Sequence, residues 1–170
     1  MKTLTQLNED FKISSKIKTP KNEKPFVYRT EDNTQLMIFD PNWKQFDYYR
    51  DKVYIEGKKV ELDSSGRTVD VMTAGYYNVN IKDIDKITDC KYMFWYNDHL
   101  ESVPYFNTCK VTNMENMFSN CRNLNSVEML DTSRVNNMYN MFYGSDYLNH
   151  ETIQRWSTVY DFENNKMKEK

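Results

Sequence analysis

The feature that most constrains this chain is a motif that recurs every 24 residues. VTNMENMFSNCRNL at 111–124 is followed 24 positions later by VNNMYNMFYGSDYL at 135–148. Five apolar columns keep the same step through three copies, among them the column of Phe94, Phe118 and Phe142. Repetition at a fixed period of about 20–50 residues is typical of architectures built from stacked structural units. We therefore expect each copy to be one such unit.

One half of each copy predicts a strand. Leu124, Val127 and Met129 form an LxxVxM string, and apolar residues stand at the same positions one and two periods earlier. Those counterparts are Leu100, Val103 and Tyr105, and before them Tyr76, Val79 and Ile81. Such a string is the strand signature of a leucine-rich repeat.

The other half of each copy predicts a short helix. Its apolar residues follow a helical spacing in the second copy at Val111, Met114, Met117 and Phe118. Thr112 and Glu115 match a capping box at the start of that helix. One strand and one or two helical turns cannot bury their own apolar faces, so neighbouring copies must stack. The sequence thus predicts an α/β fold, a short leucine-rich-repeat solenoid of about three to four 24-residue strand-plus-short-helix repeats over residues 76–160.

The rest of the chain divides into three further segments. Residues 25–75 lack the repeat and carry strand, helix and hairpin patterns, with the hairpin turning at Glu56 and Gly57. We expect an α+β N-terminal cap here, because the first repeat needs its edge covered, or alternatively a small separate α+β module. Residues 1–24 predict a flexible basic arm, and residues 161–170 a polar C-terminal tail.

Composition and charge exclude several classes of protein. Residues 1–24 carry six Lys and three acidic residues, so a formal net charge of −2 leaves −5 for the remainder. Nucleic-acid binders need a basic face, so we expect no nucleic-acid partner. No apolar run reaches the ~18 residues of a membrane span and no signal peptide is evident, which predicts a cytoplasmic protein without membrane contact. Three cysteines without CxxC spacing predict free thiols and no zinc site.

The sequence contains few residue patterns that are typical of catalytic or metal sites. His99 and His150 occupy different positions within the repeat, so they do not converge as a pair. No motif flanks Cys109 or Cys121 to mark either as a nucleophile beside a histidine base. Three aspartates lack the glycine and distal glutamate of a calcium loop: Asp83, Asp85 and Asp89. We expect no enzyme, no metal and no cofactor.

A binding surface is expected on the strands instead. Side chains that alternate with the apolar string point away from the core, onto the concave sheet of a leucine-rich repeat. Surfaces of this extended kind suit protein partners. The predicted partner-binding residues are Asn78, Asn80, Lys82, Ser102, Pro104, Phe106, Ser126, Glu128, Leu130, Thr152 and Gln154. Alternatively, Phe106 and Leu130 pack at the end of the strand, in the position that Trp156 fills in the longest copy.

The N-terminal cap is the alternative location of the binding site. A helix is expected over residues 42–51, and aromatic side chains crowd it. Aromatic residues are favoured anchors in protein interfaces. The alternative partner-binding residues are Trp43, Phe46, Tyr48 and Tyr49.

The phrases VTNMENMFSNC and TSRVNNMYNMFYGSDYLN, with the trailing Trp156, resemble the BspA-like leucine-rich repeats of bacterial surface proteins and mycoplasma lipoproteins. The resemblance covers about residues 76–160 and rests on the Val-x-Asn-Met-x-x-Met-Phe core. Two functions stay open. The first is an intracellular protein-interaction module, such as an inhibitor or adaptor encoded by a bacterial mobile element or phage. The second is a cell-surface adhesion domain, as the resemblance implies.

Overall fold

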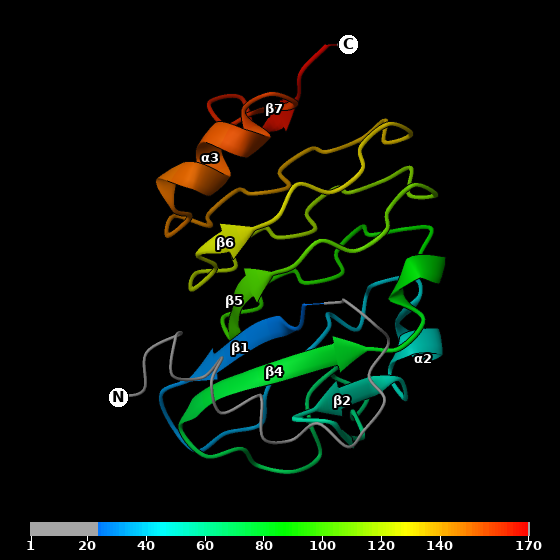
Figure 1. Cartoon of the computed structure of the whole chain (residues 1–170), viewed down its shortest axis with the longest axis vertical. Coiled ribbons are helices and arrows are strands. Elements are labelled where there is room, and N and C mark those ends of the chain that lie inside the picture. Colours follow the sequence, from blue (N-terminus) through cyan, green and yellow to red (C-terminus); the bar gives the residue numbers. More distant parts are fainter. Residues whose placement is uncertain (1–23, 170) are drawn as a thin grey trace.

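Six strands form a mixed sheet in the order β3-β2-β4-β1-β5-β6 in the computed structural model, which describes residues 24–169 (Figure 1). The strands are β1 (Phe26–Thr30), β2 (Val53–Ile55), β3 (Lys58–Lys59), β4 (Gly75–Ile81), β5 (Leu100–Val103) and β6 (Ser126–Val127). A second sheet pairs β7 (Tyr160–Asp161) with β8 (Lys166–Met167). The helices are α2 (Phe46–Tyr49), the 3-10 turn η2 (Ile84–Lys86) and α3 (His150–Trp156).

The predicted fold class, an α/β leucine-rich-repeat solenoid of strand-plus-short-helix repeats, is wrong. The structure is a mixed six-stranded sheet with a two-stranded sheet and few helices. Strand β1 lies between β4 and β5 and is antiparallel to both, so the expected stack of parallel strands is interrupted. Among the described strands, β5 and β6 alone pair in parallel. The short helix predicted in each copy, at Val111 to Phe118 in the second copy, is absent. Residues 90–97, 114–121 and 138–145, here named the turn segments, are successions of turns instead.

Backbone hydrogen bonds explain why turns replace helices. The N–H of Met117 donates to the Met114 carbonyl at 3.2 Å and closes a tight turn. The next N–H, that of Phe118, donates instead to the Met141 carbonyl in the following copy at 2.9 Å. An α-helix needs each N–H for the carbonyl four residues earlier. Because alternate N–H groups bind the neighbouring copy, a helix cannot form in these segments.

Left-handed residues recur at matching positions of the turn segments. The φ angles of Tyr92, Asn116 and Asn140 are 64°, 54° and 53°. Positive φ returns four residues later at Tyr96, Asn120 and Gly144. Only glycine and, less readily, asparagine visit this conformation routinely, and it ends a right-handed helix. The apolar spacing of three and four residues therefore marks successive turns here.

A column of phenylalanine rings runs through the core. Phe118 stacks between Phe94 and Phe142, with ring centroids 5.7 Å and 5.5 Å apart. Phe26 of β1 lies 5.7 Å from Phe94 at one end, and Phe162 lies 5.5 Å from Phe142 at the other. The N-terminal segment and the repeats thus share one continuous core.

The hairpin predicted in the N-terminal segment is confirmed. Strands β2 and β3 pair in an antiparallel register, and Glu56 and Gly57 between them have φ angles of 48° and 78°. Two positive φ angles are what a two-residue hairpin turn of the favoured hand requires. The helix expected over 42–51 is limited to α2.

Helix α3 takes the place of a further strand. Thr152 and Gln154 therefore lie in a helix, contrary to their predicted place on a strand. The Asn149 side chain caps α3 by accepting the Thr152 N–H at 2.8 Å, which is the usual role of asparagine before a helix. The Thr152 hydroxyl accepts the Val127 N–H, and the Trp156 indole N–H donates to the Val127 carbonyl. These side chains satisfy the edge of β6 that another strand would have covered.

The predicted polar tail, residues 161–170, includes strand β8 and closes the last copy. The N–H of Asn140 donates to the Asn165 carbonyl at 2.8 Å, at the position where earlier copies bind their successors. The predicted basic arm, residues 1–24, lies outside the described residues except for Lys24. Within residues 24–169, no helix has the length and apolar character needed to cross a membrane.

Candidate functional site

The polar outer face of the six-stranded sheet is the candidate site. Val27 of β1 pairs with Asn78 on one side and with Ser102 on the other. Ser102 pairs in turn with Ser126, and their hydroxyl oxygens lie 2.8 Å apart. All four residues are half-buried, whereas most of their neighbours along the strands are buried in the core. Their side chains thus form one row across β4, β1, β5 and β6.

A β-bulge adds a carboxylate to this face. Tyr28 pairs with Leu100 and Val27 pairs with Ser102, so Glu101 is an extra residue in β5. Bulges often re-aim a side chain next to a functional site. The Glu101 Oε2 is buried and has no hydrogen-bond partner among the described residues. Burial raises the pKa of the Glu101 carboxyl, and the positive charge of Arg29 lowers it in part.

An ion-pair network lies at the edge of the outer face, between helix α3 and the end of β6. The Arg155 guanidinium donates to Glu128 at 2.9 Å and to Glu151 at 2.6 Å. The Glu128 side chain is 43% exposed and the Glu151 side chain 78% exposed. Glu128 is therefore a charged group that remains accessible beside β6.

Four of the predicted partner-binding residues are buried, which removes them from any accessible surface. These are Pro104, Phe106, Leu130 and Thr152. Strand β5 ends just before Pro104, because proline has no N–H to donate to a neighbouring strand. Beyond that point Tyr105 is exposed and Phe106 packs on Phe26, with ring centroids 5.5 Å apart. The alternative placement of Phe106 and Leu130, at the end of the strand, is thus the one observed.

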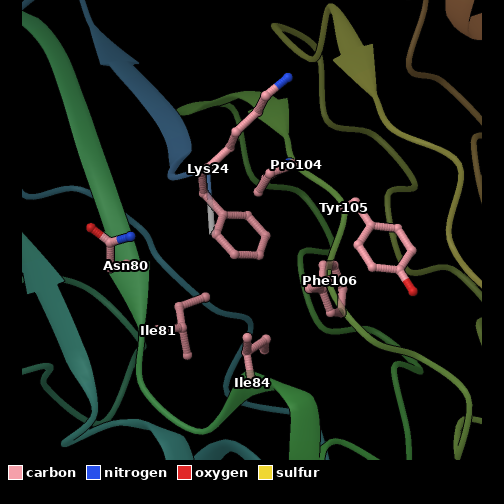
Figure 2. A pocket seen from close by; sticks show the side chains of 8 residues that line it. Lys24, Asn80, Ile81, Ile84, Pro104, Tyr105 and Phe106 are labelled. Atoms are coloured by element: carbon pink, nitrogen blue, oxygen red, sulfur yellow. The ribbon is translucent and has the colours of Figure 1, made fainter. Parts of the chain in front are cut away.

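A small hollow lies beside these residues, at the end of β4 (Figure 2). Ile81, Ile84 and Phe106 point into it, together with Pro104. Its volume is about 10 Å³, whereas a single water needs roughly 10–15 Å³. Asn80 stays on the half-exposed face beside the hollow. The hollow is part of the packing and does not form a ligand pocket.

Two other predicted residues, Lys82 and Gln154, are exposed but lie away from the row of strand side chains. Lys82 follows the end of β4, where its N–H donates to the Lys52 carbonyl at 2.9 Å. Gln154 belongs to α3. The accessible part of the predicted face therefore consists of Asn78, Asn80, Ser102, Ser126 and Glu128.

The alternative binding site on the N-terminal cap is largely core. Trp43, Phe46 and Tyr49 are buried, and Tyr48 alone of the four is exposed, at 47%. The Trp43 and Tyr49 rings stack 5.1 Å apart. The Trp43 indole N–H donates to the Asp89 carbonyl at 2.7 Å, and the Tyr49 hydroxyl donates to the Asp83 carbonyl at 3.0 Å. These aromatic residues anchor the cap to the first copy.

Two of the three cysteines serve packing and local bonding. Cys90 and Cys121 are fully buried, and burial raises the pKa of both thiols, which disfavours the nucleophilic thiolate. The Cys121 thiol donates to the Phe94 carbonyl at 2.9 Å. Within residues 24–169, no group of three histidine, cysteine or acidic side chains is arranged to hold a metal ion.

A polar cleft at one end of the sheet has no counterpart in the sequence-based site. It has a volume of about 360 Å³ and opens where β1 ends and β4 and β5 begin. Its walls come from the turn after β1 and from the residues that precede β5 and β6. They are Arg29, Thr30, Glu31, Asp32, Asn33, Thr34, Asp98, His99 and Asn123. Residues so far apart in the chain share no spacing, so no linear motif marks this cleft.

A known family matches the part of the chain that holds β4, the repeats and the second sheet. The matching family model spans residues 68–169, more than half of the chain. The chain belongs to the DUF285 family, described as a Mycoplasma protein of unknown function. No curated protein and no solved structure matches the chain. The DUF285 description names neither BspA-like repeats nor an activity, so the resemblance and the function both stay predictions.

Proposed function

We propose that this DUF285 protein is a non-enzymatic protein-interaction module that binds its partner through the outer face of the sheet. The observation that carries the proposal is the row of half-buried side chains across four neighbouring strands, which is polar on β4, β5 and β6, with Glu128 beside it. Interfaces between proteins use faces of this extended, mixed character. The further proposal is that it acts in the cytoplasm as an inhibitor or adaptor.

Other kinds of function have less support from the site. The apolar hollow, at about 10 Å³, has no more volume than a single water needs, so it is too small for an organic substrate. The two buried thiols have raised pKa values, and the buried side chains near the outer face belong to the core. A partner that contacts a broad surface fits this geometry better than a small molecule that must be enclosed.

Site-specific photo-crosslinking tests the location of the partner. A photoreactive amino acid replaces Asn78 or Ser126 on the outer face, and in a third variant it replaces Tyr139, which is 56% exposed on a turn segment. In cells, the two outer-face positions should yield the same crosslinked protein, and position 139 should not. Crosslinking from position 139 alone would place the interface on the turn segments and refute the proposal.

A matched pair of charge reversals then tests the contribution of the face to affinity. Glu128→Lys should weaken binding about tenfold, or ~1.4 kcal/mol, because it reverses the charge beside β6. Glu151→Lys also removes one carboxylate from Arg155, but on the exposed surface of α3, so it should leave affinity within about twofold. Calorimetry with the crosslinked partner measures both variants. Equal losses would show that only the Arg155 network matters.

A further inference from the structure

The polar cleft beside the outer face is large enough for a bound group. Its volume of about 360 Å³ lies within the range of roughly 300–1,000 Å³ that is typical of ligand sites. Every residue on its walls has a polar side chain, so an apolar ligand would find no matching surface. Arg29 belongs both to β1 and to the cleft wall, which places the cleft next to the outer face. A group that enters the cleft must satisfy these polar atoms.

The charges on the wall favour a cation. Arg29 is the one basic side chain on the wall, and Glu31 already pairs with it at 2.8 Å. The Asp98 carboxylate accepts a single long bond among the described residues, from the Arg122 N–H at 3.3 Å. The Asp32 carboxylate accepts no hydrogen bond within residues 24–169. Two carboxylates therefore remain free to accept donors from a ligand.

His99 adds no positive charge to the cleft. The Met37 N–H donates to its Nδ1 at 3.3 Å, and this bond requires that Nδ1 carries no proton. Burial lowers the pKa of His99, as does the charge of nearby Arg67, while Asp98 opposes them. The imidazole is therefore neutral at neutral pH. With Arg29 against Glu31, Asp32 and Asp98, the wall carries a net charge of −2.

We propose that this cleft binds the guanidinium group of an arginine side chain from the protein partner. A guanidinium presents five N–H donors in a planar fork, which can serve two carboxylates at once, and it retains its charge at every physiological pH. Asn123 supplies a further acceptor, because its amide N–H donates to the Asp98 carbonyl at 2.7 Å and leaves its Oδ1 free. The proposal rests on the protein-binding function proposed above, and it adds what that partner presents.

Titration with a blocked arginine tests the cleft without the partner. N-acetyl-arginine methylamide is added to the full chain, and the His99 ring and backbone amide signals are followed by NMR. We expect a saturable shift with a Kd of about 1 mM, as suits a single side chain. N-acetyl-citrulline methylamide, which has nearly the same shape and no charge, should bind at least about tenfold more weakly. Equal binding of the two probes would overturn the proposal.

Two matched variants locate the binding site. Asp98→Asn should weaken arginine binding at least about fivefold, because it keeps the shape of the side chain and removes one carboxylate. Asp146→Asn is the control, since Asp146 is exposed at the equivalent position of the third copy, away from the cleft wall. Equal effects of the two variants, or no saturable shift in wild type, would refute the site. Free arginine that binds more than tenfold better than the blocked form would identify the ligand as the amino acid and overturn the partner assignment.

The experiments can refute the arginine site and the proposed protein-binding function independently of each other. Saturable binding of blocked arginine without a crosslinked protein at the outer face would count against protein binding, while the cation preference of the cleft would stand. A crosslinked partner whose affinity does not change in Asp98→Asn would support protein binding and refute the role of the cleft.

Discussion

Substitution of Asn116 distinguishes a layer of turns from the helix that the apolar spacing predicts. Asn116 has a φ of 54° in the middle copy. A left-handed conformation costs a residue with a β-carbon roughly 1–2 kcal/mol, and asparagine tolerates it better than alanine. Its side-chain bond to Glu115 is 3.5 Å long and contributes little. The free energy of unfolding should therefore depend mainly on the backbone preference.

We expect Asn116→Ala to lower the free energy of unfolding by about 1 kcal/mol and Asn116→Gly to change it by less than about 0.5 kcal/mol. In a helix the order would be reversed, because alanine is the best helix former and glycine costs about 1 kcal/mol more. Urea unfolding followed by circular dichroism measures all variants. Asn136→Ala is the control, since Asn136 is exposed and its φ is not positive.

The ranking of the two Asn116 variants decides the question. A more stable alanine variant together with a less stable glycine variant would refute the turn geometry. If Asn136→Ala were as destabilising as Asn116→Ala, the effect would come from loss of the asparagine side chain in general, and the argument from φ would fail.

Two further predictions concern the core and the bulge. Phe118→Ala should lower the free energy of unfolding by about 3–5 kcal/mol in urea titrations, because Phe118 is fully buried between two stacked rings; a loss below about 1 kcal/mol would contradict the core column. Glu101→Gln should raise the stability at pH 7, since the pKa of Glu101 is raised in the folded protein and its carboxylate is disfavoured there. Wild type loses stability as the pH rises above 4.5, the ordinary pKa of a glutamate, because the Glu101 carboxyl then ionises more readily in the unfolded chain. Near pH 4 the carboxyl is mostly protonated in both states, so urea titrations should give the two proteins similar stabilities. A difference in stability that persists near pH 4 would refute the raised pKa of Glu101 as its cause.

The 24-residue columns predicted much of the core correctly. The residues of the columns at Met93, Phe94 and Leu100 are buried in the first two copies, and Leu148 in the third is partly buried. The Glu-Gly turn of the N-terminal hairpin was also readable, because tight hairpin turns restrict the residues that fit. Burial and local turns can be predicted from the sequence, because both require particular residue types at fixed spacings.

The turn segments, the strand pairing and the accessible face could not be predicted from the sequence. The spacing of Val111, Met114 and Phe118 fits both a helix and successive turns, and only the left-handed asparagines and the bonds between copies decide between them. Pairing of β1 with β5 joins segments about 70 residues apart, which no local pattern specifies. The predicted binding face differs from the accessible one because the prediction assumed strict alternation along each strand. Pro104 and the bulge at Glu101 break that alternation in β5.

The N-terminal segment completes the repeats, which leads to a prediction about the family-matched part alone. Residues 68–169 contain the whole DUF285 match but lack β1, which lies between β4 and β5. They also lose Phe26 and Phe39, whose rings lie 5.7 Å and 5.9 Å from Phe94. Residues 24–67 contribute twelve buried hydrophobic side chains in all, and at about 1.5–3 kcal/mol each their loss exceeds the 5–15 kcal/mol stability of a typical domain. This fragment should show neither a cooperative thermal transition nor dispersed amide signals by NMR. A fragment that melts cooperatively would show that the repeats need no cover from residues 24–67.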